Sequence, residues 1–315
     1  MKLNGKLFSI VVPVHNEEFA LPILYAELKK VFAQLGCRHE LVFVDDGSTD
    51  KSVDVIKELR TQDSGVKLLS FSRNFGHQVA LTAGMDFATG DVVAFMDADL
   101  QHPPALLLEM VRRWEEGYEV VYTLRQSTDD AGLGKLLSAS LFYKTFRRMT
   151  GIKLESNAAD FRLLDRKVVN VFKNSIRERT RFLRGLTAWV GFKSISIPYT
   201  AAARVGGVSK YDFRRMLILA VDGISSFSVV PLHLGIFIGA IVSLIGFFFG
   251  LFALIARFVQ GATIPGWTSL SIMVAVVGGI QLMLTGVVGI YVGKIYDEVK
   301  QRPLYLVRQS QGFDD

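Results

Sequence analysis

The stretch Phe95-Met96-Asp97-Ala98-Asp99-Leu100-Gln101-His102-Pro103-Pro104 sets two carboxylates directly behind a short apolar run. That run, Val92–Met96, predicts a buried strand that ends at Asp97. The two prolines predict the start of a helix, Pro103–Glu116, because proline lacks an amide donor that the first turn of a helix leaves unpaired. The order of strand, acidic turn and helix indicates an α/β unit with its carboxylates at a strand end.

Apolar runs and helical patterns alternate in this way through the first two-thirds of the chain. The sequence predicts strands at Phe8–Val14, Glu40–Val44, Val66–Ser70 and Val120–Thr123, and helices at Glu18–Leu35, Ser52–Gln62 and Gln78–Ala88. Such alternation is typical of an α/β fold with a mostly parallel sheet. The run at Phe8–Val14 is interpreted as a strand and not as a signal peptide, since it contains a proline and lacks a small-residue cleavage site.

Polar residues gather where the predicted strands end, at His15-Asn16-Glu17, Asp45-Asp46, Arg73-Asn74 and Asp97-Ala98-Asp99. Ligands of open α/β sheets bind beyond the carboxyl ends of the strands, so this edge is predicted to be a nucleotide site. Asp97 and Asp99 are candidate ligands for Mg²⁺ or Mn²⁺ held against a diphosphate. A carboxylate of the pair Asp45-Asp46 is a candidate acceptor for hydrogen bonds from a base or ribose; helix capping by Ser48 or Asp50 is the alternative use of this turn, and the two roles can coexist.

Composition excludes several classes of protein. A single cysteine, Cys37, excludes an intramolecular disulfide and fits a reducing compartment. The five histidines show no zinc-ligand spacing. The absence of a Walker loop, GxGxxG and GxSxG argues against a P-loop NTPase, a dinucleotide enzyme and an α/β-hydrolase. The net charge of +6 comes without a nucleic-acid-binding motif, so anionic lipid or phosphate accounts for it better than nucleic acid.

Two apolar segments, about Leu232–Ala256 and Leu270–Val292, are long enough to cross a bilayer, which takes ~20 apolar residues. The loop between them carries only Arg257 as a charge. Because basic residues flank the two segments on their outer sides, the positive-inside rule places both ends in the cytoplasm. These flanking residues are Arg204, Lys210, Arg214 and Arg215 before the first segment, and Lys294, Lys300, Arg302 and Arg308 after the second.

Segments beside the apolar ones carry further membrane signals. Apolar residues of 211–230 fall on one face, which predicts a helix lying in the membrane interface. Gly132–Met149 shows a similar pattern, with a solvated surface helix as the alternative. Gly286, Gly289 and Gly293 predict close helix contacts, including contacts between subunits, although glycine is also common in membrane helices.

Several stretches together resemble family 2 glycosyltransferases of the GT-A fold. The stretches that carry this resemblance are Ile10–Glu18, Val42–Asp50 and Phe95–Pro104. Four further stretches narrow the resemblance to the polyprenyl-phosphate glycosyltransferases, which include dolichyl-phosphate mannose synthases and bacterial GtrB-like glucosyltransferases. These stretches are Ser72–His77, Asp160–Asp165, Arg204–Tyr211 and Tyr291–Tyr305. The resemblance covers essentially the whole chain, and the last stretch, which follows the two apolar segments, looks GtrB-like.

The resemblance implies a role for each matching residue. It implies that Asp160 and Asp99 are catalytic, that Asp97, Asp99 and Gln101 hold the metal, and that the nucleotide-sugar is bound by Pro13, Asn16, Glu17, Asp46 and Asp97. The residues implied to bind the donor or acceptor phosphate are Arg125, Arg162, Arg204 and Lys210.

The resemblance also implies an inverting transfer of a hexose from a nucleotide-sugar to polyprenyl phosphate at the cytoplasmic face of a bacterial inner membrane. The expected organisation is a GT-A catalytic domain over 1–210, an interfacial helix over 211–230, two transmembrane helices over 231–293 and a cytoplasmic tail over 294–315. A homo-oligomer, by resemblance a tetramer, is expected.

The donor sugar and two rival functions stay open. UDP-glucose leads because of the GtrB-like tail, ahead of UDP-N-acetylglucosamine, a modified arabinose donor and GDP-mannose. A processive polysaccharide synthase shares the Asp-Ala-Asp motif, but Met110 stands where its Gln-x-x-Arg-Trp motif needs glutamine. A membrane scaffold with a degenerate transferase domain is disfavoured because Asp46, Asp97, Asp99 and Asp160 are all present.

Overall fold

The computed structural model describes residues 3, 5–126, 146–152, 155, 157–200, 223–260 and 266–313. The chain forms two compact units, one made of Met1–Arg215 with Arg302–Asp315 and the other of Met216–Gln301. Arg204, Lys210, most of the expected interfacial helix and most of the amphipathic segment Gly132–Met149 lie outside the described residues.

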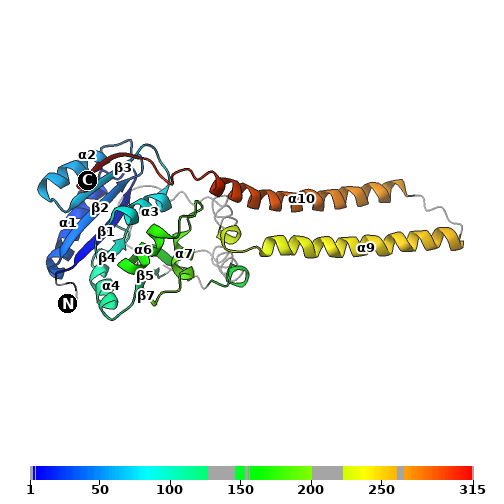
Figure 1. Ribbon diagram of the computed structural model, residues 1–315, viewed down its shortest axis with the longest axis horizontal. Coiled ribbons are helices and arrows are strands. Elements are labelled where there is room, and N and C mark those ends of the chain that lie inside the picture. Colours follow the sequence, from blue (N-terminus) through cyan, green and yellow to red (C-terminus); the bar gives the residue numbers. More distant parts are fainter. Residues whose placement is uncertain are drawn as a thin grey trace. The chain divides into compact units, whose positions relative to one another are not determined.

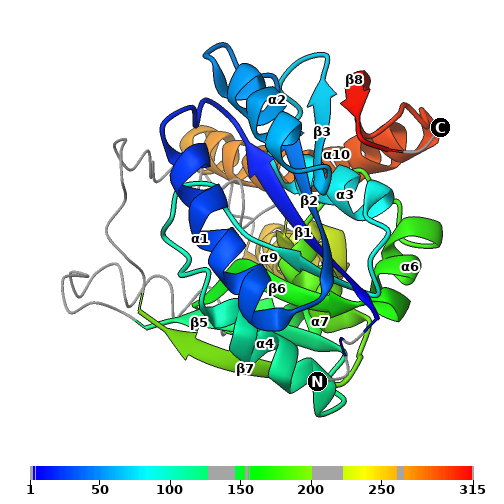
Figure 2. The same cartoon turned by 90° about the vertical axis from the view of Figure 1, so that its left-hand side faces the viewer.

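The first unit is an α/β fold built on one eight-stranded sheet of order β7-β5-β6-β4-β1-β2-β3-β8 (Figure 2). Its strands are β1 (Leu7–Val14), β2 (Arg38–Asp45), β3 (Val66–Phe71), β4 (Val92–Phe95), β5 (Val120–Arg125), β6 (Ala158–Asp165), β7 (Ser194–Tyr199) and β8 (Val307–Gln311). Its helices are α1 (Ala20–Leu35), α2 (Ser52–Gln62), α3 (His77–Phe87), α4 (Leu106–Glu115), α6 (Arg166–Asn174) and α7 (Leu183–Trp189).

The five predicted strands and four predicted helices are confirmed. Two helices begin later than predicted, α1 at Ala20 and α4 at Leu106. In both places the preceding residues form a turn that leads into the helix, since Ala20 N donates to the Glu17 carbonyl and Leu106 N donates to the Pro103 carbonyl. The central strands β4, β1, β2 and β3 are parallel, as predicted, whereas β6 and β8 run antiparallel to their neighbours.

Successive side chains of a strand point to opposite faces of the sheet, and a layer of helices packs on each face. Ile10 and Val12 of β1 face the core shared with α1, α2 and α4, whereas Val11 faces α3. Helix α3 lies so close to β1 that a Cβ on Gly84 would come within 2.0 Å of the Val11 side chain. Glycine at this position therefore lets α3 approach the sheet and sets the position of its first turn.

The second unit contains two long apolar helices, α9 (Val230–Gln260) and α10 (Trp267–Val299), drawn in yellow and orange in Figure 1. They contain Val230–Phe252 and Val276–Val299, which are long and apolar enough to cross a membrane, with mean hydropathies of 2.5 and 1.8. Large apolar side chains such as Ile236 and Leu282 are more than two-thirds exposed, which suits contact with lipid and not with water. Both apolar segments predicted from the sequence are thus helices.

Candidate active site

The edge predicted to bind ligand gathers the ends of several strands. Asp45 is the last residue of β2, and Asp97 follows β4 by two positions. Strand β6 pairs antiparallel with β4, with Arg162 opposite Phe95, so Asp160 extends past the carboxyl end of β4. Because one strand ends where its antiparallel neighbour begins, Asp97 and Asp160 come to the same edge although 62 residues separate them.

Asp160 is held by two arginines. Arg184 of α7 donates from Nε and Nη2 to the two carboxylate oxygens of Asp160, both at 2.8 Å. Arg162 Nη2 lies 3.9 Å from Asp160 Oδ1. A two-point arginine–carboxylate contact fixes the plane of the carboxylate as well as its position. Gln78 completes the cluster, since its Nε2 donates to Asp160 Oδ2 at 3.4 Å.

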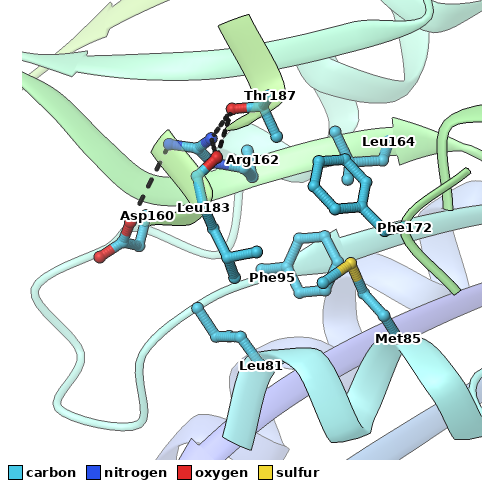
Figure 3. A pocket seen from close by; sticks show the side chains of 9 residues that line it. All are labelled: Leu81, Met85, Phe95, Asp160, Arg162, Leu164, Phe172, Leu183 and Thr187. Atoms are coloured by element: carbon cyan, nitrogen blue, oxygen red, sulfur yellow. Dashed lines mark hydrogen bonds and ion pairs between the residues drawn. The ribbon is translucent and has the colours of Figure 1, made fainter. Parts of the chain in front are cut away.

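Arg162 is almost fully buried, and the two terminal nitrogens of its guanidinium contact protein groups (Figure 3). It donates to the Ala159 carbonyl at 3.0 Å and to the Thr187 hydroxyl. Beneath it lie apolar side chains around a cavity of about 10 Å³, no larger than one water molecule needs. Leu81, Met85, Phe95, Leu164 and Phe172 make up this apolar floor.

The electrostatics of the cluster keep Asp160 ionised. Burial alone would raise the pKa of Asp160, but the charge and hydrogen bonds of Arg184 and the charge of Arg162 outweigh it and hold that pKa well below its usual range. Burial lowers the pKa of Arg162 to about 10, so its side chain still carries a charge at neutral pH. Asp160 is therefore a carboxylate with little tendency to accept a proton.

The first turn of α3 binds the carboxylate of Asp97. His77 Nε2 lies 2.7 Å from Asp97 Oδ1, while His102 Nδ1 is 3.3 Å from the Asp97 amide nitrogen. The ring of His102 stacks on Phe161, with centroids 5.1 Å apart. His77 and Gln78 are neighbours in the chain, so one helical turn contacts both Asp97 and Asp160.

The turn after Asp97 exposes part of Asp99, as a metal ligand requires. Asp99 Oδ1 accepts a hydrogen bond from the Gln101 amide at 3.1 Å, and Leu100 between them has φ of 60°. Within the described part of the chain, no three His, Cys, Asp or Glu side chains are grouped to hold a metal ion. Mg²⁺ and Mn²⁺ at nucleotide sites take one or two carboxylates and fill the rest with phosphate oxygens and water, so Asp97 and Asp99 fit such an ion together with a diphosphate.

Asp46 lies at a separate part of the edge, between β2 and the loop 72–76. Its carboxylate accepts hydrogen bonds from the amides of Phe75 at 2.6 Å and Gly76 at 2.9 Å. Gly47 has φ of 70°, and a Cβ there would lie 2.7 Å from the Arg73 and Asn74 backbone. Burial raises the pKa of Asp46, partly offset by these two amides. Asp46 thus binds the loop 72–76 to the end of β2.

The other residues implied to bind nucleotide surround the same turn. Asn16, with φ of 59°, donates from its amide to Ser48 Oγ at 3.0 Å, and its side-chain oxygen accepts from the Thr49 amide at 2.8 Å. The Glu17 amide donates to Ser52 Oγ at 2.8 Å. Pro13 is buried in β1 beyond Val11, the last residue of β1 that pairs with β4, so its missing N–H leaves no gap on that side.

The two remaining candidates also lie at this edge, since β4 and β5 both run antiparallel to β6. Arg125 ends β5 with an exposed side chain, and Gln101 contributes its backbone amide to the Asp99 turn. Sequence reasoning assigned no role to His77, Gln78 or Arg184, which contact the central carboxylates directly. His77 is the last residue of Ser72–His77, one of the stretches that carry the family resemblance, so that stretch could have pointed to a role for it. Arg184 gave none, because its partner lies 24 residues away on another element.

Comparison with known proteins identifies the family. The family model described as glycosyl transferase family 2 matches residues 9–172, which contain the sheet edge with Asp46, Asp97, Asp99 and Asp160. The chain belongs to glycosyl transferase family 2. This enzyme is 44% identical to the uncharacterized glycosyltransferase YkcC of Bacillus subtilis (strain 168), with 98% of this chain and 95% of that protein covered.

Relatives with more specific names also match over nearly the whole chain. The enzyme is 39% identical to the SfII prophage-derived bactoprenol glucosyl transferase of Shigella flexneri, covering 96% of this chain and 97% of that protein. Among solved structures it is similar to glucosyl-3-phosphoglycerate synthase from Mycobacterium tuberculosis in complex with Mn²⁺, UDP and phosphoglyceric acid. That match has a TM-score of 0.46 at 20% identity and covers 70% of this chain and 77% of the other.

Proposed function

We propose that this family 2 glycosyltransferase moves one hexose from a nucleotide-sugar, with UDP-glucose as the leading donor, to polyprenyl phosphate at the cytoplasmic face of the membrane. The observation that carries the proposal is that a bactoprenol glucosyl transferase aligns with 96% of the chain, so the match takes in the two apolar helices as well as the catalytic unit. A polyprenyl acceptor keeps its chain in the bilayer, and the two apolar helices would hold the enzyme there.

The site chemistry supports a direct displacement with inversion. The acceptor phosphate has a second pKa of about 6, so it is largely ionised near neutral pH and needs no general base. Asp160, which the two arginines keep ionised, suits a role in orienting the acceptor or stabilising positive charge on the reacting sugar. Arg162 is too buried to meet a phosphate freely, and we assign it to positioning Asp160.

Asp97 and Asp99 would hold Mg²⁺ or Mn²⁺, and the ion would neutralise charge on the leaving nucleoside diphosphate. Asp46 and the turns at Asn16 and Glu17 would border the nucleotide. Arg125, together with Arg204 and Lys210 outside the described residues, stays a candidate for the phosphate groups. A homo-oligomer remains part of the proposal.

An assay with undecaprenyl phosphate and a panel of radiolabelled nucleotide-sugars tests the function. We expect one lipid-linked hexose per acceptor, with UDP-glucose giving the fastest transfer. A polymeric product would instead indicate a processive synthase. No transfer from any donor to this acceptor, by enzyme that binds nucleotide, would contradict the proposal.

The proposed topology has two membrane crossings with the catalytic unit and the tail on one side. Strand β8 pairs with β3 of the catalytic sheet, so the chain returns after α10 to the unit that it left before α9. This return supports an even number of crossings. The boundaries 1–210, 211–230, 231–293 and 294–315 stay proposals, except that residues 302–313 are better described as part of the catalytic unit than as a free tail.

We expect cysteine labelling in intact cells to show this topology. In a Cys37→Ser background, a cysteine at Ser310, which is exposed on β8, should stay protected from a membrane-impermeant maleimide. A cysteine at Gln260, the last residue of α9, should react. Permeabilised cells provide the control, in which both positions should react. Labelling at Ser310 before permeabilisation would rule out the two-crossing arrangement.

A further inference from the structure

The segment that follows α10, residues 302–313, is built into the catalytic sheet, and we call it the C-terminal tail. Its strand β8 lies beside β3 (Figure 2). The two strands pair antiparallel, with Ser310 opposite Leu69 and Val307 opposite Phe71. One residue further, the Ser72 amide donates to the Leu306 carbonyl at 3.0 Å. The pairing therefore continues to the first residue of the loop 72–76, which Asp46 binds.

We propose that the C-terminal tail positions the loop 72–76 for binding of the donor nucleotide, with Tyr305 as the positioning residue. The inference rests on the proposed function, in which Asp46 and its loop border the nucleotide. It goes further by assigning a role in donor binding to a segment that begins 226 residues after the end of the loop in sequence.

Tyr305 is anchored by a half-buried acidic residue of α3, Asp86. Its hydroxyl donates to Asp86 Oδ2 at 2.8 Å, and Arg177 donates to both oxygens of the same carboxylate at 2.7 and 3.0 Å. Burial, together with the Asp86 charge, raises the pKa of Tyr305. The hydroxyl therefore keeps its proton and remains a hydrogen-bond donor across the physiological pH range.

Ring contacts connect this anchor to the loop. The Tyr305 ring stacks on Phe71 with centroids 5.3 Å apart, and Phe71 packs edge-on against Phe75 at 5.6 Å. Phe75 is the residue whose amide donates to Asp46 Oδ1 at 2.6 Å. Arg73 lies over the Phe75 ring at 4.1 Å. Displacement of Tyr305 would remove the ring that packs on Phe71, and Phe71 is the ring that packs on Phe75.

The far end of the tail is fastened separately. Phe313 packs edge-on against Phe87 with centroids 5.1 Å apart, and Lys67 Nζ lies 5.2 Å above the Phe313 ring. At the near end, Arg179 donates to the Arg302 carbonyl. The simpler role for such a strand is to cover the open edge of β3, which would otherwise be free to pair with other chains. The two ends of the tail allow these roles to be separated.

The test compares Tyr305→Leu with Phe313→Leu in the full-length enzyme in detergent, because each removes one ring from the tail. Binding of UDP with Mn²⁺ is measured by calorimetry, beside the melting temperature and the donor KM and kcat. For Tyr305→Leu we expect the UDP Kd and donor KM to rise roughly fivefold to tenfold, the value of one aromatic contact, with kcat little changed. Phe313→Leu should lower the melting temperature and leave the UDP Kd unchanged.

Equal losses of melting temperature with an unchanged UDP Kd in both variants would mean that the tail only covers the edge of β3, and would overturn the proposal. If Tyr305→Leu fails to fold, Tyr305→Phe decides, since it keeps the ring and loses only the bond to Asp86; an unchanged UDP Kd there overturns the proposal. A wild-type enzyme that bound no nucleoside diphosphate would instead overturn the proposed function, and the inference with it.

Discussion

Replacing Asp160 with asparagine should lower kcat by about 10²–10³-fold, the range found when one preorganised electrostatic group is removed from an active site. Asparagine keeps the shape of the side chain but loses the charge, which both arginines are arranged to meet. The folded domain should also lose about 3 kcal/mol of stability, because Arg162 would be left as a buried charge without its partner. Single-turnover kinetics with saturating donor and chemical denaturation measure the two effects.

Glu40→Gln is the matched control for this substitution. Glu40 is also a buried carboxylate paired with a cation, Lys67 Nζ at 2.6 Å, but it lies near the start of β2, at the opposite edge of the sheet from Asp46. Glu40→Gln should lower the unfolding free energy and leave kcat close to that of the wild type. If both variants lost activity in proportion to their stability, Asp160 would have a structural role alone.

The dependence on pH gives a second view of Asp160 in the wild-type enzyme. Its folded-state pKa lies below the unfolded value of about 3.9, so the stabilisation by its ion pairs is fully present above that value and is lost as the pH falls below it. Titration of Asp160 should therefore not limit kcat between about pH 5 and pH 8. A general base with a raised pKa would instead produce a fall in kcat within this window.

The parts of the fold that the sequence predicted are those with local signals. Strands β1, β2, β3 and β4 are short apolar runs buried on both faces, and each is followed by a helix with regular apolar spacing. The parallel core and its ligand edge follow from that order. Strand β6 escaped prediction because its alternation of charged and apolar residues, with Asp160 and Arg162 facing α7 while Phe161 and Leu163 face the core, is confined to residues 160–163.

The contacts within the site depend on pairings that no local pattern encodes. Asp160 was recognised through its family stretch alone, and its bond with Arg184 depends on where α7 packs after β6. Strand β8 was missed for a different reason. Its sequence, Val307-Arg308-Gln309-Ser310-Gln311, is polar, because an edge strand with an exposed face needs few apolar residues. Its pairing with β3 joins segments that are far apart in the sequence, and no local pattern predicts such a pairing.

Replacing Asp99 with asparagine should reduce kcat/KM by about 10²–10³-fold, because a metal ligand that loses its charge forfeits several kcal/mol of transition-state stabilisation. Folding should survive, since the side-chain oxygen of asparagine can still accept the hydrogen bond from the Gln101 amide that closes the turn. The stimulation of UDP binding by Mn²⁺ should fall as well. Calorimetric titration of UDP with and without Mn²⁺ measures this effect independently of catalysis.

Asp54→Asn is the control for loss of one acidic charge, because Asp54 is exposed on α2 and pairs loosely with Lys57 at 3.8 Å. It should leave both kcat/KM and the response to Mn²⁺ unchanged. Loss of activity in Asp99→Asn without a weaker response to Mn²⁺ would mean that Asp99 acts on the sugar or acceptor and does not hold the metal. Turnover near the wild-type rate with metal present would show that Asp99 is not part of the site. Asp97, which His77 contacts, would then be the remaining carboxylate of this turn available to hold the ion.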